Sequence, residues 1–199
     1  MDTYKTINNT SEGLYKEKGS KFISYAYHVE TVEEVSEIVS RLKKEYFDAR
    51  HHCFAWRMGA KGEKTRVVDD GEPSSTAGKP ILGQILSLEV TDVLIVVIRY
   101  FGGTLLGASG LIRAYKEAAY DALTNAEIVE KFVETTFDIK FTYFVMNDVM
   151  KIIKDTNPNV LEKVFDIDCF MKLSIRESLA DGLLERLKKV EGIEIEIDN

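Results

Sequence analysis

The most constraining feature of the sequence is a run of six aliphatic residues, Val93 to Ile98, with a glycine-rich segment close behind it. Uninterrupted β-branched and aliphatic residues of this kind predict a strand that is buried on both faces. After the glycines, Leu111, Tyr115 and Ala118 recur at helical spacing with no proline among them, which predicts a helix. We therefore expect a buried strand, a glycine-rich loop and a helix, in that order.

The glycine-rich segment, residues 102–110, predicts an anion-binding site. Backbone N–H groups at the start of a helix have no intrahelical partner, and the helix dipole favours negative charge there. Arg99 and Arg113 flank the segment and supply planar pairs of donors. The glycine spacing is that of a P-loop, but Ala108 stands where a P-loop has its lysine, which excludes an ordinary nucleoside triphosphatase. Alternatively, the glycines only permit a tight turn and close packing, without a ligand.

A second chemical segment, residues 69–80, holds three acids, three hydroxyl side chains and two of the three prolines of the chain. Its acids are opposite in charge to the arginines beside the glycines, so we expect both segments to form one site. The acids would repel phosphate unless they are paired with cations. The candidate anion or RNA site contains Lys79, Arg99, Tyr100, Gly102, Gly103, Gly107, Ser109, Gly110 and Arg113, with an opposing loop of Asp69, Asp70, Glu72, Ser74, Thr76 and Gly78. Lys16, Lys18 and Lys21 are possible outer cations or, alternatively, only a solvated loop.

Composition restricts the classes of partner. The 199 residues carry a net charge of −7, of which residues 1–133 contribute −2 and the remainder −5. This charge argues against nucleic-acid binding through bulk charge and directs any anionic partner to the first part of the chain. Cys53 and Cys169 are far apart, which predicts reduced thiols. Without a signal-peptide pattern or a long apolar run, we expect a cytoplasmic protein with no membrane contact.

The chain is expected to form two domains, residues 1–133 and 134–199. In the first we expect strands near residues 4–7, 22–29, 51–59 and 65–68, a helix that begins with a capping box at Thr31, and a charged turn over residues 15–21. In the second, strict alternation over residues 137–143 predicts a half-buried strand. A helix, two strands, a helix and a last strand follow, which is the βαββαβ order of a ferredoxin-like unit.

The two chemical segments, residues 69–80 and 99–115, resemble the signatures of the Impact/YigZ family, and residues 19–23 fit as well. This family includes bacterial YigZ-type proteins and eukaryotic Impact regulators of translation. The resemblance covers essentially the whole chain. Ser75 and Ser109 stand where the family usually has glycine, which matters wherever that glycine takes a positive φ.

The resemblance implies an α+β protein. Its first domain would resemble the second domain of a small-subunit ribosomal protein, and its second would be ferredoxin-like, similar to the last domain of elongation factor G. The implied function is a non-catalytic translation-associated regulator, or a protein that binds RNA or the ribosome. The expected partners are RNA, the ribosome or a translation-associated protein, without sequence-specific readout of DNA.

Two other functions fit the same residues. In the first, Asp69, Asp70 and Glu72 hold Mg²⁺ for a metal-assisted enzyme that acts on a phosphate-containing substrate. His51 is the only obvious base, and the nucleophile–base–orienter set is incomplete, so we assign no catalytic residue, metal or cofactor. Residues 51–53 do not predict a zinc site, because neighbours on a strand point to opposite faces. In the second, Asp70 and Glu72 pair with Arg99 and Arg113 in an interaction scaffold.

Overall fold

The computed structural model describes residues 2–197, which divide into two compact units. One unit is Tyr4–Lys131, and the other contains residues 132–197 together with residues 2–3. Helices and strands occur in both units, which confirms the α+β class. Among residues 2–197, no helix has the length and apolar character needed to cross a membrane.

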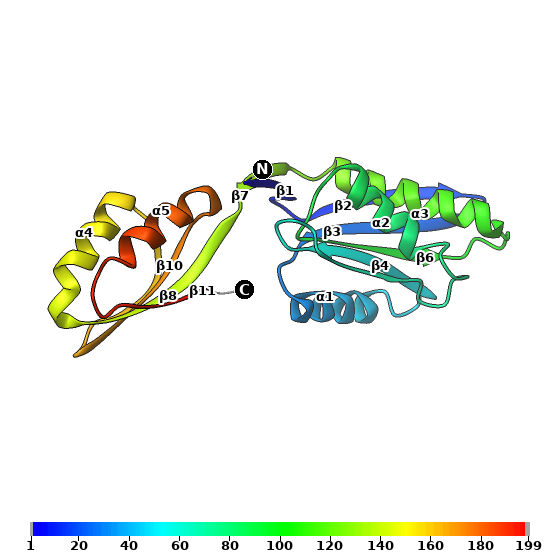
Figure 1. Ribbon diagram of the computed structural model, residues 1–199. Helices are drawn as coiled ribbons and strands as arrows, with labels where there is room; N and C mark the ends of the chain where they lie inside the picture. The colour runs from blue at the N-terminus through cyan, green and yellow to red at the C-terminus, as the bar shows by residue number, and fades with distance from the viewer. Residues whose placement is uncertain (1, 198–199) are drawn as a thin grey trace. The chain divides into compact units, whose positions relative to one another are not determined.

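The first unit is a three-layer arrangement around an antiparallel sheet. Its elements are β1 (Thr3–Ile7), β2 (Ser11–Glu17), β3 (Ser20–His28), α1 (Val32–Glu45), β4 (His51–Met58), β5 (Lys64–Val68), α2 (Gly78–Ser87), β6 (Val93–Tyr100), α3 (Gly107–Thr124) and β7 (Ile128–Phe132). The main sheet has the order β2-β3-β6-β4-β5, and β1 pairs with β7 in a separate two-stranded sheet. Helix α1 covers one face of the main sheet, whereas α2 and α3 cover the other (Figure 1).

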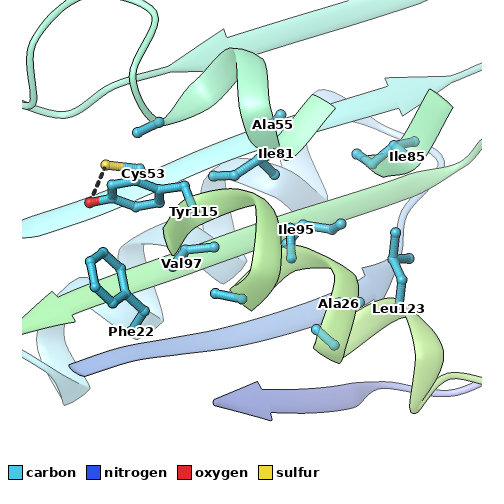
Figure 2. Packing of buried hydrophobic residues seen from close by; sticks show 14 of the residues in the cluster. Phe22, Ala26, Cys53, Ala55, Ile81, Ile85, Ile95, Val97, Tyr115 and Leu123 are labelled. Carbon is cyan, nitrogen blue, oxygen red and sulfur yellow. Dashed lines mark hydrogen bonds between the residues drawn. The ribbon is translucent and has the colours of Figure 1, made fainter. Parts of the chain in front are cut away.

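Strand β6 is buried on both faces, which confirms the strand expected at residues 93–98. Because side chains alternate along a strand, Leu94 and Val96 pack in the core beneath α1. Ile95 and Val97 pack in the opposite core, against α2 and α3 (Figure 2). The central strand therefore carries both hydrophobic cores of this unit, and its end is held in a fixed position.

The hairpin β2–β3 corrects the sequence-based expectation for residues 15–21. That segment is not a charged turn, because residues 15–17 belong to β2 and only Lys18 and Gly19 form the turn, both with positive φ. Burial alternates along β2, with Ser11 and Gly13 inside. Glu12 and Lys16 lie on the outer face of the strand, which hides the strand pattern in the sequence. The capping box at Thr31 is confirmed.

The second unit has the strand order of a ferredoxin-like fold. It contains β8 (Glu134–Thr142), the 3-10 turn η1 (Tyr143–Val145), α4 (Met146–Thr156), β9 (Asn159–Val164), β10 (Asp168–Arg176), α5 (Glu177–Leu187) and β11 (Glu194–Ile197). The sheet order is β11-β8-β10-β9, and all neighbouring strands are antiparallel. Both helices pack on a core that includes Phe137, Ile139 and Leu173. The βαββαβ order expected from the sequence is therefore present.

Helix α3 lies unusually close to β2 and β3. The hydroxyl groups of Ser11 and Ser24 donate to the carbonyl oxygens of Ala122 and Ala118 at 2.7 and 2.6 Å. A Cβ atom at Gly13 would lie 2.4 Å from the backbone nitrogen of Ala122. Glycine is therefore required at this position so that the helix backbone can approach the strand.

Replacement of Gly13 by alanine is expected to lower the free energy of unfolding by about 2 kcal/mol, because the helix backbone must move. The control is Gly83→Ala in α2, where an added Cβ meets nothing within 4 Å. That change is expected to raise the free energy of unfolding by up to ~1 kcal/mol through helix propensity. Urea denaturation measures both values, and effects of the same sign would contradict the close approach at Gly13.

Candidate functional site: a cavity between the two signature segments

A buried ion pair joins the two segments that the sequence singled out. Nη1 of Arg99, near the end of β6, donates to Oε1 of Glu72 at 2.6 Å, and their side chains are only 7% and 4% exposed. The hydroxyl of Tyr115, from α3, donates to the same carboxylate oxygen at 2.7 Å. The Arg99 guanidinium carbon also lies 5.5 and 5.8 Å from the ring centroids of Phe22 and Phe101. The loop, the strand and the helix are thus held together at one point.

A cavity of about 470 Å³ opens beside this ion pair. Its lining residues are Arg50, His51, Glu72, Pro73, Arg99, Phe101, Leu105, Leu106, Gly107, Ala108 and Leu111. Most of these side chains are apolar, and Leu105 is 83% exposed while Phe101 is 46% exposed. The cavity therefore combines apolar walls with a small set of charged and polar groups.

His51 belongs to the site although it was not included in the predicted set. It begins β4 directly opposite Arg99 in the strand register. Its Nδ1 lies 2.9 Å from the carbonyl oxygen of Asp70, which can only accept, so Nδ1 is the donor. Nε2 lies 4.0 Å from Oε1 of Glu72. The alternation expected for residues 51–53 is confirmed, since His52 contacts the carbonyl of Tyr46 instead.

Asp69 holds the start of α2 in place. Its Oδ1 accepts from the N–H groups of Ala77 and Gly78 at 3.1 and 2.8 Å, and Oδ2 accepts from Ser75 at 2.9 Å. Burial alone would raise the pKa of Asp69, but these three backbone hydrogen bonds outweigh it and lower the pKa below its ordinary value of 3.8. The negative charge of Asp69 is therefore satisfied inside the protein.

Asp70 is also engaged internally. Its Oδ1 accepts from Nζ of Lys43 at 2.9 Å, and its Oδ2 accepts from the backbone N–H of His52 at 2.7 Å. Burial opposes ionisation, but these hydrogen bonds prevail and the pKa of Asp70 is lowered. Within residues 2–197, no group of three or more His, Cys, Asp or Glu side chains is arranged to hold a metal ion. The Mg²⁺ site envisaged for Asp69, Asp70 and Glu72 therefore has no converging set of carboxylates.

The glycine segment combines packing with an uncapped helix start. A Cβ at Gly102 would lie 1.9 Å from the backbone carbon of Gly19, so the β2–β3 turn lies directly against this segment. Gly103 and Gly107 have φ of +86° and +70°. Helix α3 begins at Gly107 after Leu106, which makes no side-chain capping bond. Close packing therefore explains the glycine at residue 102, whereas Gly107 stands at a helix start without a side-chain cap.

The remaining predicted residues take other places. Ser109 and Gly110 lie in the first turn of α3. Gly78 packs against Val68, and the hydroxyl of Thr76 donates to the carbonyl of Pro73. Ser74 and Lys79 are exposed and lie outside the cavity lining. The ion pair expected between Glu72 and Arg99 is present. The pairing expected for Asp70 and Arg113 is wrong, because Asp70 pairs with Lys43 and Arg113 with Glu17.

The aromatic side chain available to a ligand is Phe101, whereas Tyr100 faces the side of the sheet that α1 covers. The Tyr100 hydroxyl donates to Asp48 at 2.7 Å, and burial together with this bond raises the pKa of Tyr100 to about 12. Phe101 follows Arg99 by two residues, and side chains two residues apart on an extended chain lie on the same face. This alternation could have predicted from the sequence that Phe101, and not Tyr100, lies beside Arg99.

Fold and site together define an α+β protein whose first unit holds a cavity between two signature segments. The sequence pattern of the Impact N-terminal domain matches residues 18–123. An IMPACT family member from Haemophilus influenzae is 33% identical over 172 residues, which cover 85% of this chain and 84% of that protein. IMPACT family member YigZ from Escherichia coli is 33% identical over 160 residues, covering 79% and 78%. The chain therefore belongs to the Impact family.

A solved structure agrees with this fold over the whole chain. The crystal structure of a hypothetical protein matches with a TM-score of 0.78 at 26% sequence identity, and the match covers 100% of this chain and 98% of that one. An experimentally determined structure therefore has the same two folds in the same order along the chain.

Ser75, one of the two departures from the usual glycines, takes a φ of +65°. We expect Ser75→Gly to raise the free energy of unfolding by about 0.5 kcal/mol, because relief of the left-handed strain exceeds the added chain entropy. The control is Ser74→Gly, at a neighbouring position without positive φ, which is expected to lower it by about 0.5 kcal/mol. Urea denaturation that shows equal losses for both variants would rule out strain at Ser75.

The buried pair of Arg99 and Glu72 is tested by a double-mutant cycle. Arg99→Met or Glu72→Leu is expected to lower the free energy of unfolding by about 3 kcal/mol, since each leaves a buried charge unpaired. The double variant is expected to lose about 2 kcal/mol less than the sum of the single changes. Arg113→Met serves as the control, because its side chain is 61% exposed and an exposed pair contributes at most about 1 kcal/mol. Additive losses in urea denaturation would argue against the pair.

Proposed function

We propose that this protein is a translation-associated binding protein whose first unit contacts RNA, as free RNA or on the ribosome. The observation that carries the proposal is the arrangement around the glycine segment, where an exposed aromatic ring, an uncapped helix start and the turn that holds Lys18 adjoin. Membership of a family that includes eukaryotic regulators of translation supports the link to translation.

The cations come from the end of the β2–β3 hairpin, with Lys18 in the turn, Lys16 in β2 and Lys21 in β3. Lys16, Lys18 and Lys21 are exposed, and none of them forms an ion pair within the described part of the chain. The turn contacts the glycine segment, because a Cβ at Gly19 would lie 2.7 Å from the carbonyl oxygen of Gly102. Lys18 is next to the residue that contacts the glycine segment, and a cation near free backbone N–H groups favours phosphate oxygens. Lys16 and Lys21 are paired in register with each other, and Lys21 with Tyr100, so both lie on the face of the sheet that α1 covers.

The aromatic contact is Phe101, which is 46% exposed and rests beside the Arg99 guanidinium. Unpaired bases stack on exposed aromatic rings with little dependence on sequence. Since residues 1–133 carry a net charge of −2, the attraction must come from the local lysine cluster. Binding is therefore expected to weaken steeply with salt.

The enzyme alternative has less support from the geometry. The hydroxyl of Thr76 is bonded to the carbonyl of Pro73, and neither Thr76 nor Ser74 lines the cavity that contains His51. A nucleophile requires a base within hydrogen-bond reach. The described residues therefore offer a binding surface rather than a nucleophile–base pair.

The proposal is tested by fluorescence anisotropy with a labelled single-stranded RNA of mixed sequence over a series of salt concentrations. Lys18→Ala is expected to reduce the slope of log K against log salt by about 0.7. Phe101→Ala is expected to weaken binding by about 1–3 kcal/mol. The matched control is Lys64→Ala, since Lys64 is exposed on β5 at the opposite edge of the sheet. Absence of binding at low salt, or an equal effect of Lys64→Ala, would refute the proposal.

A further inference from the structure

We propose that the cavity between the two signature segments binds a free small organic anion that has an apolar body, such as a phosphate or carboxylate attached to a ring or a short aliphatic chain. This ligand site goes beyond the proposed RNA contact. The RNA contact would use the turn that holds Lys18, the Phe101 ring and the start of α3, whereas the small ligand would also use Arg50 and the apolar walls of the cavity.

The dimensions and the walls fit such a ligand. A volume of about 470 Å³ lies within the range of small-molecule sites, roughly 300–1,000 Å³. Leu105, Leu106, Leu111 and Pro73 supply apolar surface. Leu105 is 83% exposed, so its apolar surface is in contact with water until a ligand covers it. These walls would add little to the binding of an inorganic ion.

The start of α3 supplies donors for an anionic head group. Gly107 and Ala108 line the cavity and begin a helix of 18 residues. No acidic residue lies in its first turn, and Leu106 makes no side-chain capping bond. The N–H groups at this end are therefore oriented for an external acceptor, and the helix dipole adds to the attraction.

Arg99 provides an independent indication of an anion. Its side chain is 93% buried in the cavity lining, yet Nε has no hydrogen-bond partner among residues 2–197. Buried polar groups in proteins are nearly always satisfied, and this unmet donor belongs to a side chain of the cavity lining, so the guanidinium has capacity for an acceptor that the described residues do not supply. The carboxylate of Glu72 does not oppose this, because it already accepts from Arg99 and Tyr115.

Arg50 adds the uncompensated charge of the cavity. It is exposed, it lies in the lining, and none of the ion pairs formed by the described residues includes it. With the charges of Arg99 and Glu72 balanced against each other, Arg50 and the helix start leave the cavity net positive. A neutral apolar ligand would not use this charge, and a cation would be repelled by it.

Isothermal titration calorimetry of the full chain with three probes tests the site. Phenyl phosphate contains both the anion and the ring, inorganic phosphate only the anion, and phenol only the ring. We expect phenyl phosphate to bind at one site and the other two probes to bind at least about tenfold more weakly. Equal affinity for phenyl phosphate and inorganic phosphate would overturn the proposal, because the apolar walls would then contribute nothing.

Variants that preserve the buried ion pair locate the binding. Ala108→Leu fills the cavity from an exposed position, and it is expected to reduce phenyl phosphate affinity more than about tenfold. Arg50→Gln is expected to reduce it about tenfold through the lost charge-assisted hydrogen bond. The matched control, Arg66→Gln on β5, should leave the affinity unchanged. Thermal denaturation verifies that each variant is folded, and wild-type affinity in Ala108→Leu would overturn the assignment.

The same measurements separate this site from the RNA surface. Lys18→Ala is expected to weaken RNA binding and to leave phenyl phosphate binding intact, whereas Arg50→Gln is expected to weaken phenyl phosphate binding and to leave RNA binding intact. A failure of RNA binding with intact phenyl phosphate binding would refute only the proposed function. Displacement of phenyl phosphate by RNA would show that the cavity holds a nucleotide of RNA, and would overturn the proposal of a free ligand.

Discussion

The buried pair of Arg99 and Glu72 is the interaction on which the candidate site depends. Two charges removed from water are stable only with close geometry and additional hydrogen bonds, and Tyr115 supplies one of these bonds. Cys53 extends the network, since its thiol lies 3.3 Å from the Tyr115 hydroxyl and 3.0 Å from the carbonyl oxygen of Asp69. Burial raises the pKa of both Cys53 and Tyr115, so each remains a neutral donor. A strand end, a helix and a loop are thereby fixed together.

Backbone contacts complete what the ion pair begins. Gly13 allows α3 to lie on β2, and Gly102 allows the β2–β3 turn to lie on the glycine segment. Side chains at either position would separate the elements that carry Lys18 and Phe101. The cavity and the β2–β3 turn therefore owe their positions to close packing at these two glycines.

Much of the fold could be predicted from the sequence because its signals are local. The aliphatic run of β6 and the alternation of β8 identify their strands directly, and the capping box at Thr31 marks the start of α1. Strand β2 was missed because Glu12 and Lys16, on its outer face, resemble turn residues. Its inner face has only Ser11 and Gly13 fully buried, so no hydrophobic period is visible there.

The two segments of the site could be identified from their composition, but the partner of each charge could not. Asp70 pairs with Lys43, 27 residues away, and Arg113 pairs with Glu17, 96 residues away. Nothing in the residue types distinguishes these pairings from those expected, because a carboxylate accepts any nearby cation. Arg50 was missed, and His51 was named only as a possible base, because the pairing of β4 with β6 is what brings them to Arg99.

These internal pairings resolve the objection that an acidic loop lies next to an anion site. Asp69 is satisfied by backbone N–H groups, Asp70 by Lys43 and the N–H of His52, and Glu72 by Arg99 and Tyr115. Compensated carboxylates contribute little repulsion beyond their immediate partners. The surface beside the glycine segment is therefore governed by its exposed cations, although the whole chain carries a charge of −7. The net charge of the chain therefore does not exclude an anion at the proposed site, because the acids beside that site are paired internally.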